Sequence, residues 1–270
     1  MTEKRKSPLI TILTDFGEED WFVAAMKGVI ASLAPESPTI DITHRVPPGD
    51  IRRGALVLRC AYRSFPPGTV HLAVVDPGVG TDRGVLAARA GDYLFVAPDN
   101  GLLSWVLREE IEPAVFRANR KDLFLPRPST TFHDRDIFAP LAARLAAGFP
   151  LSETGPPLDD PVIFPPPLLR ARGENRWEAE IIGRDRFGNC LTSLGRETAG
   201  GGGADVLLIS IGGRTLRFPL ADCFGSVPAG RPLAVWGSCG FLELAVNGGD
   251  AGRELDLEAG EKFTARWAEL

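Results

Sequence analysis

The sequence predicts two domains, an N-terminal α/β domain with a mainly parallel sheet and a smaller C-terminal all-β domain of barrel-like form. The chain has 270 residues, well beyond the roughly 150 residues of an average domain. Its first half alternates short apolar runs with helical patterns, as βαβ units do. Beyond residue 172, short apolar runs alternate with glycine-rich turns, which is typical of a small barrel or sandwich.

The α/β alternation begins with an expected strand at 9–13 and an expected helix at 22–33. Phe22, Met26 and Ile30 are among the apolar positions that follow the helical period. Further elements are expected as strands at 39–42, 69–75 and 93–97 and as helices near 51–63 and 137–147. Polar loops follow three of these strands, namely TDFG at 14–17, DPGVGTDRG at 76–84 and APDNG at 97–101. Ligands of such sheets bind at the carboxyl ends of the strands.

A proline-rich segment marks the expected domain boundary, because proline is excluded from helix interiors and central strands. We therefore predict an N-terminal domain over 1–158, a linker over 159–171 and a C-terminal domain over 172–270. Strands of the second domain are expected at 178–182, 206–211, 216–220, 233–236 and 241–246.

Composition and charge exclude several classes of partner. The net charge is −5, which disfavours nucleic acid as a ligand. The longest apolar run, at 21–26, is far shorter than the roughly 20 residues of a membrane span. No signal-peptide pattern is visible at the amino terminus, so we expect a cytoplasmic protein without a membrane partner. The four cysteines form no C-x-x-C pair, which argues against both a zinc site and a disulfide framework.

Few side chains are available for acid or base chemistry near neutral pH, because the chain has three histidines. His71 lies within an expected strand and is predicted to be a buried sheet residue, whereas His44 lies in a loop and is predicted to support a turn. His133 precedes the expected helix at 137–147. Together with Asp76 at a strand end and Arg83 on the same loop, it could position and polarise a water molecule.

Seven motifs stand out in order along the chain: TDFG at 14–17, DITHRVPPGDIRRGA at 41–55, VVDPGVGTDR at 74–83, APDNGLL at 97–103, TFHDRDIFAP at 131–140, DRFGN at 185–189 and GSCGFLELAVNGG at 237–249. Together they resemble the motifs of the S-adenosyl-L-methionine hydroxide adenosyltransferases, relatives of fluorinase and chlorinase. The resemblance implies an α/β domain, a C-terminal β-barrel and a homotrimer with sites between subunits. It also implies hydrolysis of S-adenosyl-L-methionine to adenosine and L-methionine, with no metal and no cofactor.

The resemblance also implies the residues of the site. The water-activating residues would be Asp76, Arg83 and His133. The substrate-binding residues would be Asp15 at the ribose hydroxyls, Asp185 and Asn189 at the methionine moiety, Phe187 near the nucleoside, and Phe132, Ser238 and Glu243 elsewhere in the site.

One residue departs from the family pattern, since Asp134 follows the histidine where the family usually has glycine. We expect Asp134 to cap the helix that begins near Ile137, a role that suits aspartate. In the alternative orientation its carboxylate would face the nucleophile. A like charge at 4 Å would then cost about 4 kcal/mol at an effective dielectric constant of about 20.

Two other functions remain open at this point. A non-catalytic sensor of adenosine or S-adenosyl-L-methionine would keep the binding residues, and Asp134 is the best argument for it. A metal-dependent hydrolase could use Asp15, Asp20, Asp76 and His133, although their spacing matches no metal motif. A halogenase is disfavoured, because the family's halide users lack the aspartate and histidine that this chain has.

Overall fold

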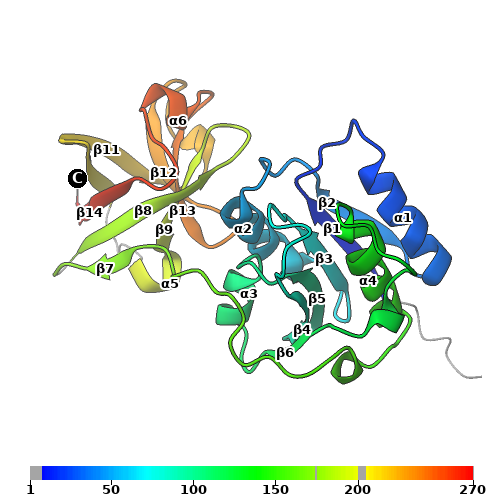
Figure 1. Cartoon of the computed structure of the whole chain (residues 1–270). Helices are drawn as coiled ribbons and strands as arrows, with labels where there is room; N and C mark the ends of the chain where they lie inside the picture. The colour runs from blue at the N-terminus through cyan, green and yellow to red at the C-terminus, as the bar shows by residue number, and fades with distance from the viewer. Residues whose placement is uncertain (1–7, 174, 200–204, 270) are drawn as a thin grey trace, which may run out of the picture. The chain divides into compact units, whose positions relative to one another are not determined.

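The chain folds into two compact units (Figure 1). A computed structural model describes residues 8–173, 175–199 and 205–269. One unit extends to Phe164 and the other begins at Pro165, so the division falls within the proline-rich segment. The first unit is an α/β domain and the second is a β-barrel, which confirms the predicted fold class.

The N-terminal unit is built on one mixed sheet of six strands. In the order in which they lie across the sheet, these are β2 (Thr39–Thr43), β1 (Ile10–Thr14), β3 (Val70–Val74), β5 (Tyr93–Pro98), β4 (Val85–Ala90) and β6 (Ala114–Arg117). Strands β2, β1, β3 and β5 are parallel, as expected, whereas β4 is antiparallel to both of its neighbours. Because the first four strands share a direction, their carboxyl ends lie at one edge of the sheet.

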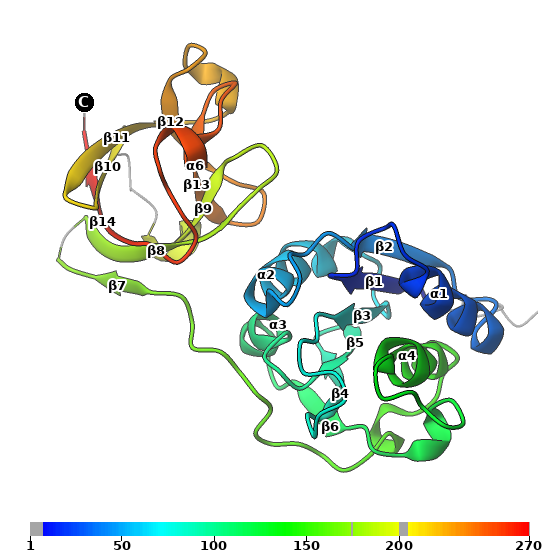
Figure 2. The same ribbon diagram turned by 45° about the horizontal axis from the view of Figure 1, so that its top comes forward.

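Helices cover both faces of this sheet (Figure 2). They are α1 (Phe22–Leu33) and α4 (Ala139–Ala146) on one face and α2 (Ile51–Ala61) and α3 (Ser104–Glu109) on the other. Short 3₁₀ turns lie at η1 (Tyr62–Ser64), η2 (Lys121–Leu123) and η4 (Leu151–Glu153). Successive strand residues alternate between the two layers: Leu72 packs with α1 and α4, whereas Ala73 packs with α2.

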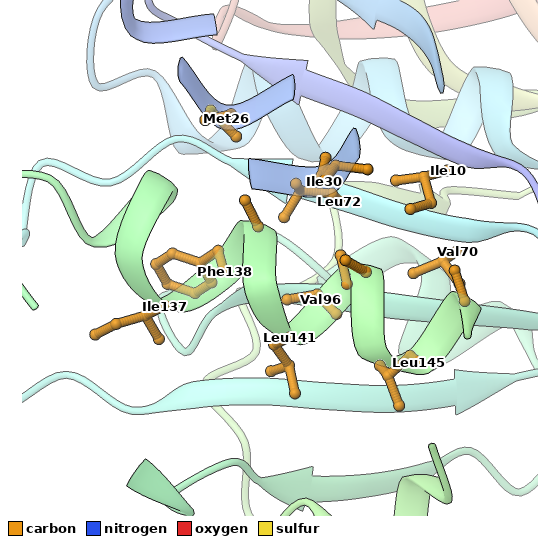
Figure 3. Packing of buried hydrophobic residues seen from close by; sticks show 14 of the residues in the cluster. Ile10, Met26, Ile30, Val70, Leu72, Val96, Ile137, Phe138, Leu141 and Leu145 are labelled. Atoms are coloured by element: carbon orange, nitrogen blue, oxygen red, sulfur yellow. The ribbon is translucent and has the colours of Figure 1, made fainter. Parts of the chain in front are cut away.

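The layer that contains α1 and α4 supports the site described below. Figure 3 shows Leu141 and Leu145 along α4, with Phe138 at the amino-terminal end of the helix, and these residues share one apolar cluster with side chains of α1 and β3. Phe138, Leu141 and Leu72 are fully buried, so the helix is fixed against the sheet by apolar packing.

The start of α4 differs from the helix predicted at 137–147. Residues Asp134–Phe138 form a π-helical turn, η3, that continues into α4. The physical reason lies in Pro140, which has no N–H to offer the carbonyl of Asp136 four residues earlier. That carbonyl instead accepts a hydrogen bond from the amide of Leu125 at 2.8 Å. Such π turns are frequent at functional sites.

The C-terminal unit is a seven-stranded barrel, visible as a ring in Figure 2. Its strands, in order around the ring, are β14 (Lys262–Ala268), β10 (Val206–Ile211), β11 (Arg214–Ala221), β12 (Pro232–Trp236), β13 (Phe241–Val246), β9 (Cys190–Gly195) and β8 (Arg176–Arg184). The pairing of β14 with β8 closes the ring, and β7 (Leu169–Ala171) pairs with β8 outside it. All pairs around the ring are antiparallel except β11 with β12.

Short helical segments join some of these strands, and the interior of the barrel is apolar. The helical segments are α5 (Arg196–Ala199), η5 (Phe224–Ser226) and α6 (Ala251–Glu254). Leu207, Phe218 and Leu244 are fully buried within the ring. The five strands expected in this domain are confirmed, whereas β7, β9 and β14 were not predicted.

Candidate functional site

Acidic residues gather where the parallel strands of the first unit end. Asp15 directly follows β1, and Asp76 lies two residues beyond β3. Strands β1 and β3 are neighbours, with Thr14 paired to Val74, so both carboxylates leave the sheet at the same edge. Oδ2 of Asp15 accepts a hydrogen bond from the amide of Gly49 at 2.7 Å.

Asp76 is joined to Arg83 in a nearly buried ion pair. The guanidinium donates from both Nε and Nη2 to Oδ2 of Asp76, with a distance of 2.8 Å from Nε. The two side chains are only 3% and 10% exposed, respectively. The guanidinium carbon of Arg83 also lies 4.9 Å from the ring centroid of Phe138, a cation–π contact. Ion pair and ring together fix the position of this arginine.

The same arginine contacts His133. Its Nη2 lies 3.0 Å from Nδ1 of the imidazole. A guanidinium only donates hydrogen bonds, so Nδ1 must be the acceptor and the ring proton must lie on Nε2. Burial lowers the pKa of His133, and the positive charge of Arg83 lowers it further. His133 is therefore a neutral imidazole with a fixed tautomer near neutral pH, and its Nε2–H is a hydrogen-bond donor.

Two features fix the segment that carries His133, and the first also brings the loop of Arg83 close to it. Gly80 has a φ of +81°, and a Cβ there would lie 2.7 Å from the carbonyl oxygen of Thr130. Only glycine allows this approach without strain. The buried carboxylate of Asp136 accepts a hydrogen bond from the amide of Ser129 and pairs with Arg135. The segment before His133 is thus fixed on both sides.

Asp134 does not cap a helix, so the expectation of a capping role was wrong. The residue lies inside the π turn, where neither its neighbour His133 nor any other side chain caps the amino terminus. Asp134 is 5% exposed, and its Oδ1 has no hydrogen-bond partner among the described residues. Burial raises the pKa of its carboxyl to about 7, and the charges of Asp76 and Asp15 contribute in the same direction. Packing of η3 against the sheet turns the carboxyl inward, which a local capping preference could not reveal.

Phe132 and His71 were also singled out in this unit, and the structure gives them different surroundings. Phe132 precedes His133 and packs its ring against Phe22 at 5.2 Å between centroids, so it is 7% exposed. His71 is fully buried and bonded to Oγ1 of Thr11, which confirms it as a sheet residue.

The remaining histidine, His44, is also structural. It lies in the loop after β2, and its Nδ1 is 2.8 Å from Oγ1 of Thr14, the last residue of β1. Phe138, whose ring contacts the guanidinium of Arg83, was not predicted as part of the site. In the sequence, an apolar residue at the start of a helix looks like any residue of the hydrophobic core.

The second unit brings together other predicted residues around the turn after β8. Oδ1 of Asp185 accepts hydrogen bonds from the amides of Phe187 and Asn189, and Oδ2 accepts one from the Asn189 side chain. Phe187 is 77% exposed, an unusual state for a large aromatic ring. A pocket of about 470 Å³ is lined by Phe187, Asn189, Phe224, Val246, Gly248 and Gly249.

Glu243 and Ser238 complete the predicted set in the barrel. Glu243 lies on β13 and is half-buried, and burial raises the pKa of its carboxyl, with the charge of Asp185 adding to the effect. Ser238 lies in the exposed turn between β12 and β13. Among the described residues, no group of three or more His, Cys, Asp or Glu side chains is arranged to hold a metal ion. None of the helices described here is long and apolar enough to cross a membrane.

The chain thus combines an α/β unit, which carries an Asp–Arg–His group at its sheet edge, with a closed β-barrel. Family models identify this combination. The S-adenosyl-L-methionine hydroxide adenosyltransferase N-terminal domain matches residues 10–155, and the C-terminal domain of the same family matches residues 179–264. The chain belongs to the S-adenosyl-L-methionine hydroxide adenosyltransferase family.

Individual relatives match along nearly the whole chain. An (R)-S-adenosyl-L-methionine hydrolase of Salinispora tropica is 44% identical over 95% of this chain and 97% of its own length. One of the same name from Thermus thermophilus is 41% identical over 93% and 96%, respectively. A fluorinase of Actinopolyspora mzabensis is 29% identical over 96% and 97%. A crystal structure of an uncharacterized conserved protein from Thermotoga maritima has a TM-score of 0.90 at 36% identity, covering 95% of this chain and 99% of that one.

The raised pKa of Asp134 predicts a pH-dependent cost to stability. Between its ordinary value of 3.8 and about 7, the folded state keeps this proton while the unfolded state has released it. Raising the pH through this window therefore favours unfolding, by about 1.4 kcal/mol per pH unit for one group. Asp134→Asn cannot ionise, so the wild type should lose stability relative to this variant as the pH rises from 4 to 7.

Urea denaturation at a series of pH values measures the difference. The exposed Asp92, in the turn between β4 and β5, gives a matched control, since Asp92→Asn should follow the wild type at every pH. If the free energy of unfolding changed equally with pH in the wild type and in Asp134→Asn, the pKa of the Asp134 carboxyl would not be raised in the folded state.

Proposed function

We propose that this protein hydrolyses S-adenosyl-L-methionine to adenosine and L-methionine by attack of a water molecule on the ribose 5′ carbon. The observation that carries the proposal is the group of Asp76, Arg83 and His133, in which one guanidinium contacts both other side chains. Relatives that are 41% and 44% identical along nearly the whole chain carry the name of this hydrolase. Family membership and site chemistry therefore support the same reaction.

The reaction places modest demands on the protein. The leaving group departs from a sulfonium as a neutral thioether, so no acid needs to protonate it. What the site must provide is a water molecule held in line with the C5′–S bond and partly removed from bulk solvent. A group of fixed, nearly buried polar side chains meets this requirement.

We assign distinct roles to the three residues. The Nε2–H of His133 donates a hydrogen bond to the water oxygen and so orients a lone pair toward C5′. Arg83 fixes the imidazole tautomer and stabilises negative charge that develops on the nucleophile. Asp76 holds Arg83 in place, because its Oδ2 accepts hydrogen bonds from both Nε and Nη2 of the guanidinium.

The substrate-binding roles follow from the chemistry of the other residues. Asp15 offers carboxylate oxygens to the ribose hydroxyls, and Phe132 adds a small aromatic surface beside His133. In the barrel, Asp185 and Asn189 bind the methionine moiety, with Glu243 and Ser238 beside them, while the exposed ring of Phe187 lies near the nucleoside. The acidic residues also suit a cationic sulfonium ligand.

The proposal also covers the oligomeric state, the cellular compartment and the lack of a cofactor. The two sets of binding residues lie in different units, which agrees with a homotrimer whose sites lie between the N-terminal unit of one subunit and the C-terminal unit of the next. We propose that the enzyme works in the cytoplasm and needs neither a metal nor a cofactor, because the substrate carries its own activated leaving group.

Product analysis tests the proposed function. Purified protein, incubated with S-adenosyl-L-methionine without added metal, should release adenosine and L-methionine in equal amounts. Arg83→Ala should lower the rate about 100-fold or more, because it removes charge stabilisation and releases His133. The exposed Arg89 on β4 provides the matched control, since Arg89→Ala should keep the wild-type rate. Bound but unreacted substrate after long incubation would instead favour the sensor function, and loss of activity on chelation would favour the metal-dependent hydrolase.

Two further variants should separate binding from catalysis. Asp15→Ala removes a charged acceptor worth roughly 1.5–3 kcal/mol, so it should weaken adenosine binding by about tenfold or more. His133→Ala removes the group that orients the water and should lower kcat by about 100-fold or more while adenosine affinity changes little. Calorimetric titration with adenosine and steady-state kinetics measure both effects. Unchanged adenosine affinity in Asp15→Ala would contradict the ribose assignment.

A further inference from the structure

One motif of the sequence, APDNGLL at 97–103, contributes no residue to the proposed catalytic or binding set. Its first two residues end β5, which is parallel to β3, so the turn that follows lies at the sheet edge where β3 also ends. Asn100 in this turn is partly buried, and its Nδ2 donates a hydrogen bond to the carbonyl oxygen of Val75 at 2.9 Å. Val75 immediately precedes Asp76, so the motif contacts the loop of the proposed catalytic group.

This hydrogen bond takes the place of strand pairing that stops short of the loop. On one side, β3 is paired with β5 as far as Leu72 with Val96. On the other side, it is paired with β1 as far as Val74 with Thr14. Val75 lies beyond both and is fully buried, and a buried carbonyl needs a partner. The side chain of Asn100 supplies that partner.

The position of the Val75 carbonyl matters for Asp76. The carbonyl of Val75 and the amide of Asp76 belong to one planar peptide unit. Holding the oxygen therefore orients the plane from which Asp76 continues and constrains the direction of its carboxylate. That carboxylate accepts two hydrogen bonds from Arg83, and Arg83 contacts His133. A displacement of the carbonyl would thus affect all three side chains.

The residue before Asn100 holds the other end of the same loop. The amide of Asp99 donates a hydrogen bond to the carbonyl of Gly84 at 3.0 Å, and Gly84 directly follows Arg83. A Cβ at Gly84 would lie 3.2 Å from Cβ of Asp99, so the two segments are in close contact. Two consecutive residues of one turn therefore bind the two residues that flank the loop from Asp76 to Arg83.

The turn is itself fixed by further hydrogen bonds. Oδ1 of Asn100 accepts one from the amide of Leu102 at 3.2 Å, so both polar atoms of this side chain are engaged. Oδ1 of Asp99 accepts one from the amide of Val162 at 2.8 Å. A side chain whose own orientation is fixed in this way can hold its partner in one position.

We propose that Asn100 is a positioning residue for the hydrolytic step, an inference that rests on the proposed function. Asn100 acts through the carbonyl of Val75 on Asp76. Because Arg83 contacts both Asp76 and His133, the imidazole that orients the water depends on the same hydrogen bond. Such an indirect contact can matter, since a misplacement of about 1 Å can lower a rate about 100-fold.

Two variants remove the donor in different ways. In Asn100→Asp the side chain keeps its shape and the acceptor for Leu102, but an oxygen replaces the donor nitrogen. Asn100→Ser is neutral, and its hydroxyl ends one atom short of the amide nitrogen. The exposed Asn119, in the loop after β6, gives matched controls as Asn119→Asp and Asn119→Ser.

The experiment measures kcat per folded molecule, adenosine affinity by calorimetry, and the nitrogen-15 spectrum of the His133 imidazole. Both Asn100 variants should lower kcat by about 10-fold to 100-fold while adenosine affinity stays within about threefold. The Nδ1 and Nε2 resonances of His133 should move toward each other, because without a fixed donor at Nδ1 the two tautomers interconvert. Both control variants should match the wild type in all three measurements.

Two results would overturn the proposal. If Asn100 has a structural role alone, its variants will lower the free energy of unfolding but leave kcat and the imidazole spectrum unchanged. A lower kcat in Asn100→Asp but not in Asn100→Ser would mean that the added charge, and not the lost donor, is responsible.

Failure of the proposed function would look different. The wild type would then bind S-adenosyl-L-methionine but form no product, whereas failure of the positioning role leaves the wild type active. In the absence of product, the imidazole spectra decide by themselves whether Asn100 fixes the Asp76, Arg83 and His133 group.

Discussion

The contact of Arg83 with both Asp76 and His133 is the interaction on which the site depends. It joins a loop after β3 to the start of η3, two segments that are fifty residues apart in sequence. Because the guanidinium only donates, it also decides which nitrogen of His133 carries the proton. Three residues of the fold make this contact possible. The ring of Phe138 packs against the guanidinium, and Gly80 lets the loop of Arg83 approach the segment of His133 closely. Pro140 lies just beyond the π turn that follows the histidine.

The acidic residues near the site differ in role because their surroundings differ. Asp76 is paired with an arginine and Asp15 with a backbone amide, whereas Asp134 is buried with an unpartnered oxygen. In our account, the first positions Arg83 and the second binds the ribose. Carboxylates of the same unit can thus differ in role, because their hydrogen-bond partners and their burial differ.

Regular elements were predictable where their periodicity was strong. The expected helix at 22–33 coincides with α1, and the buried strands β1, β3 and β5 were recognised from apolar runs. Strand β4 was missed because its sequence VLAARA is rich in alanine, which is poorly represented in strands. The residues of the proposed catalytic group could be named from motifs, but their contacts depend on tertiary packing. The inward orientation of Asp134 was mispredicted for the same reason, since local propensity suggests a cap and only the packing of η3 against the sheet buries the carboxyl.

The central claim is that Arg83 keeps His133 neutral with its proton on Nε2. Nitrogen-15 NMR of the imidazole at neutral pH tests it directly, because protonated and unprotonated ring nitrogens resonate far apart. With three histidines in the chain, a His133→Gln variant suffices to assign the signal. The account predicts an unprotonated Nδ1 and a protonated Nε2 at pH 7 in the wild type. A proton on Nδ1, or a doubly protonated ring at that pH, would contradict it.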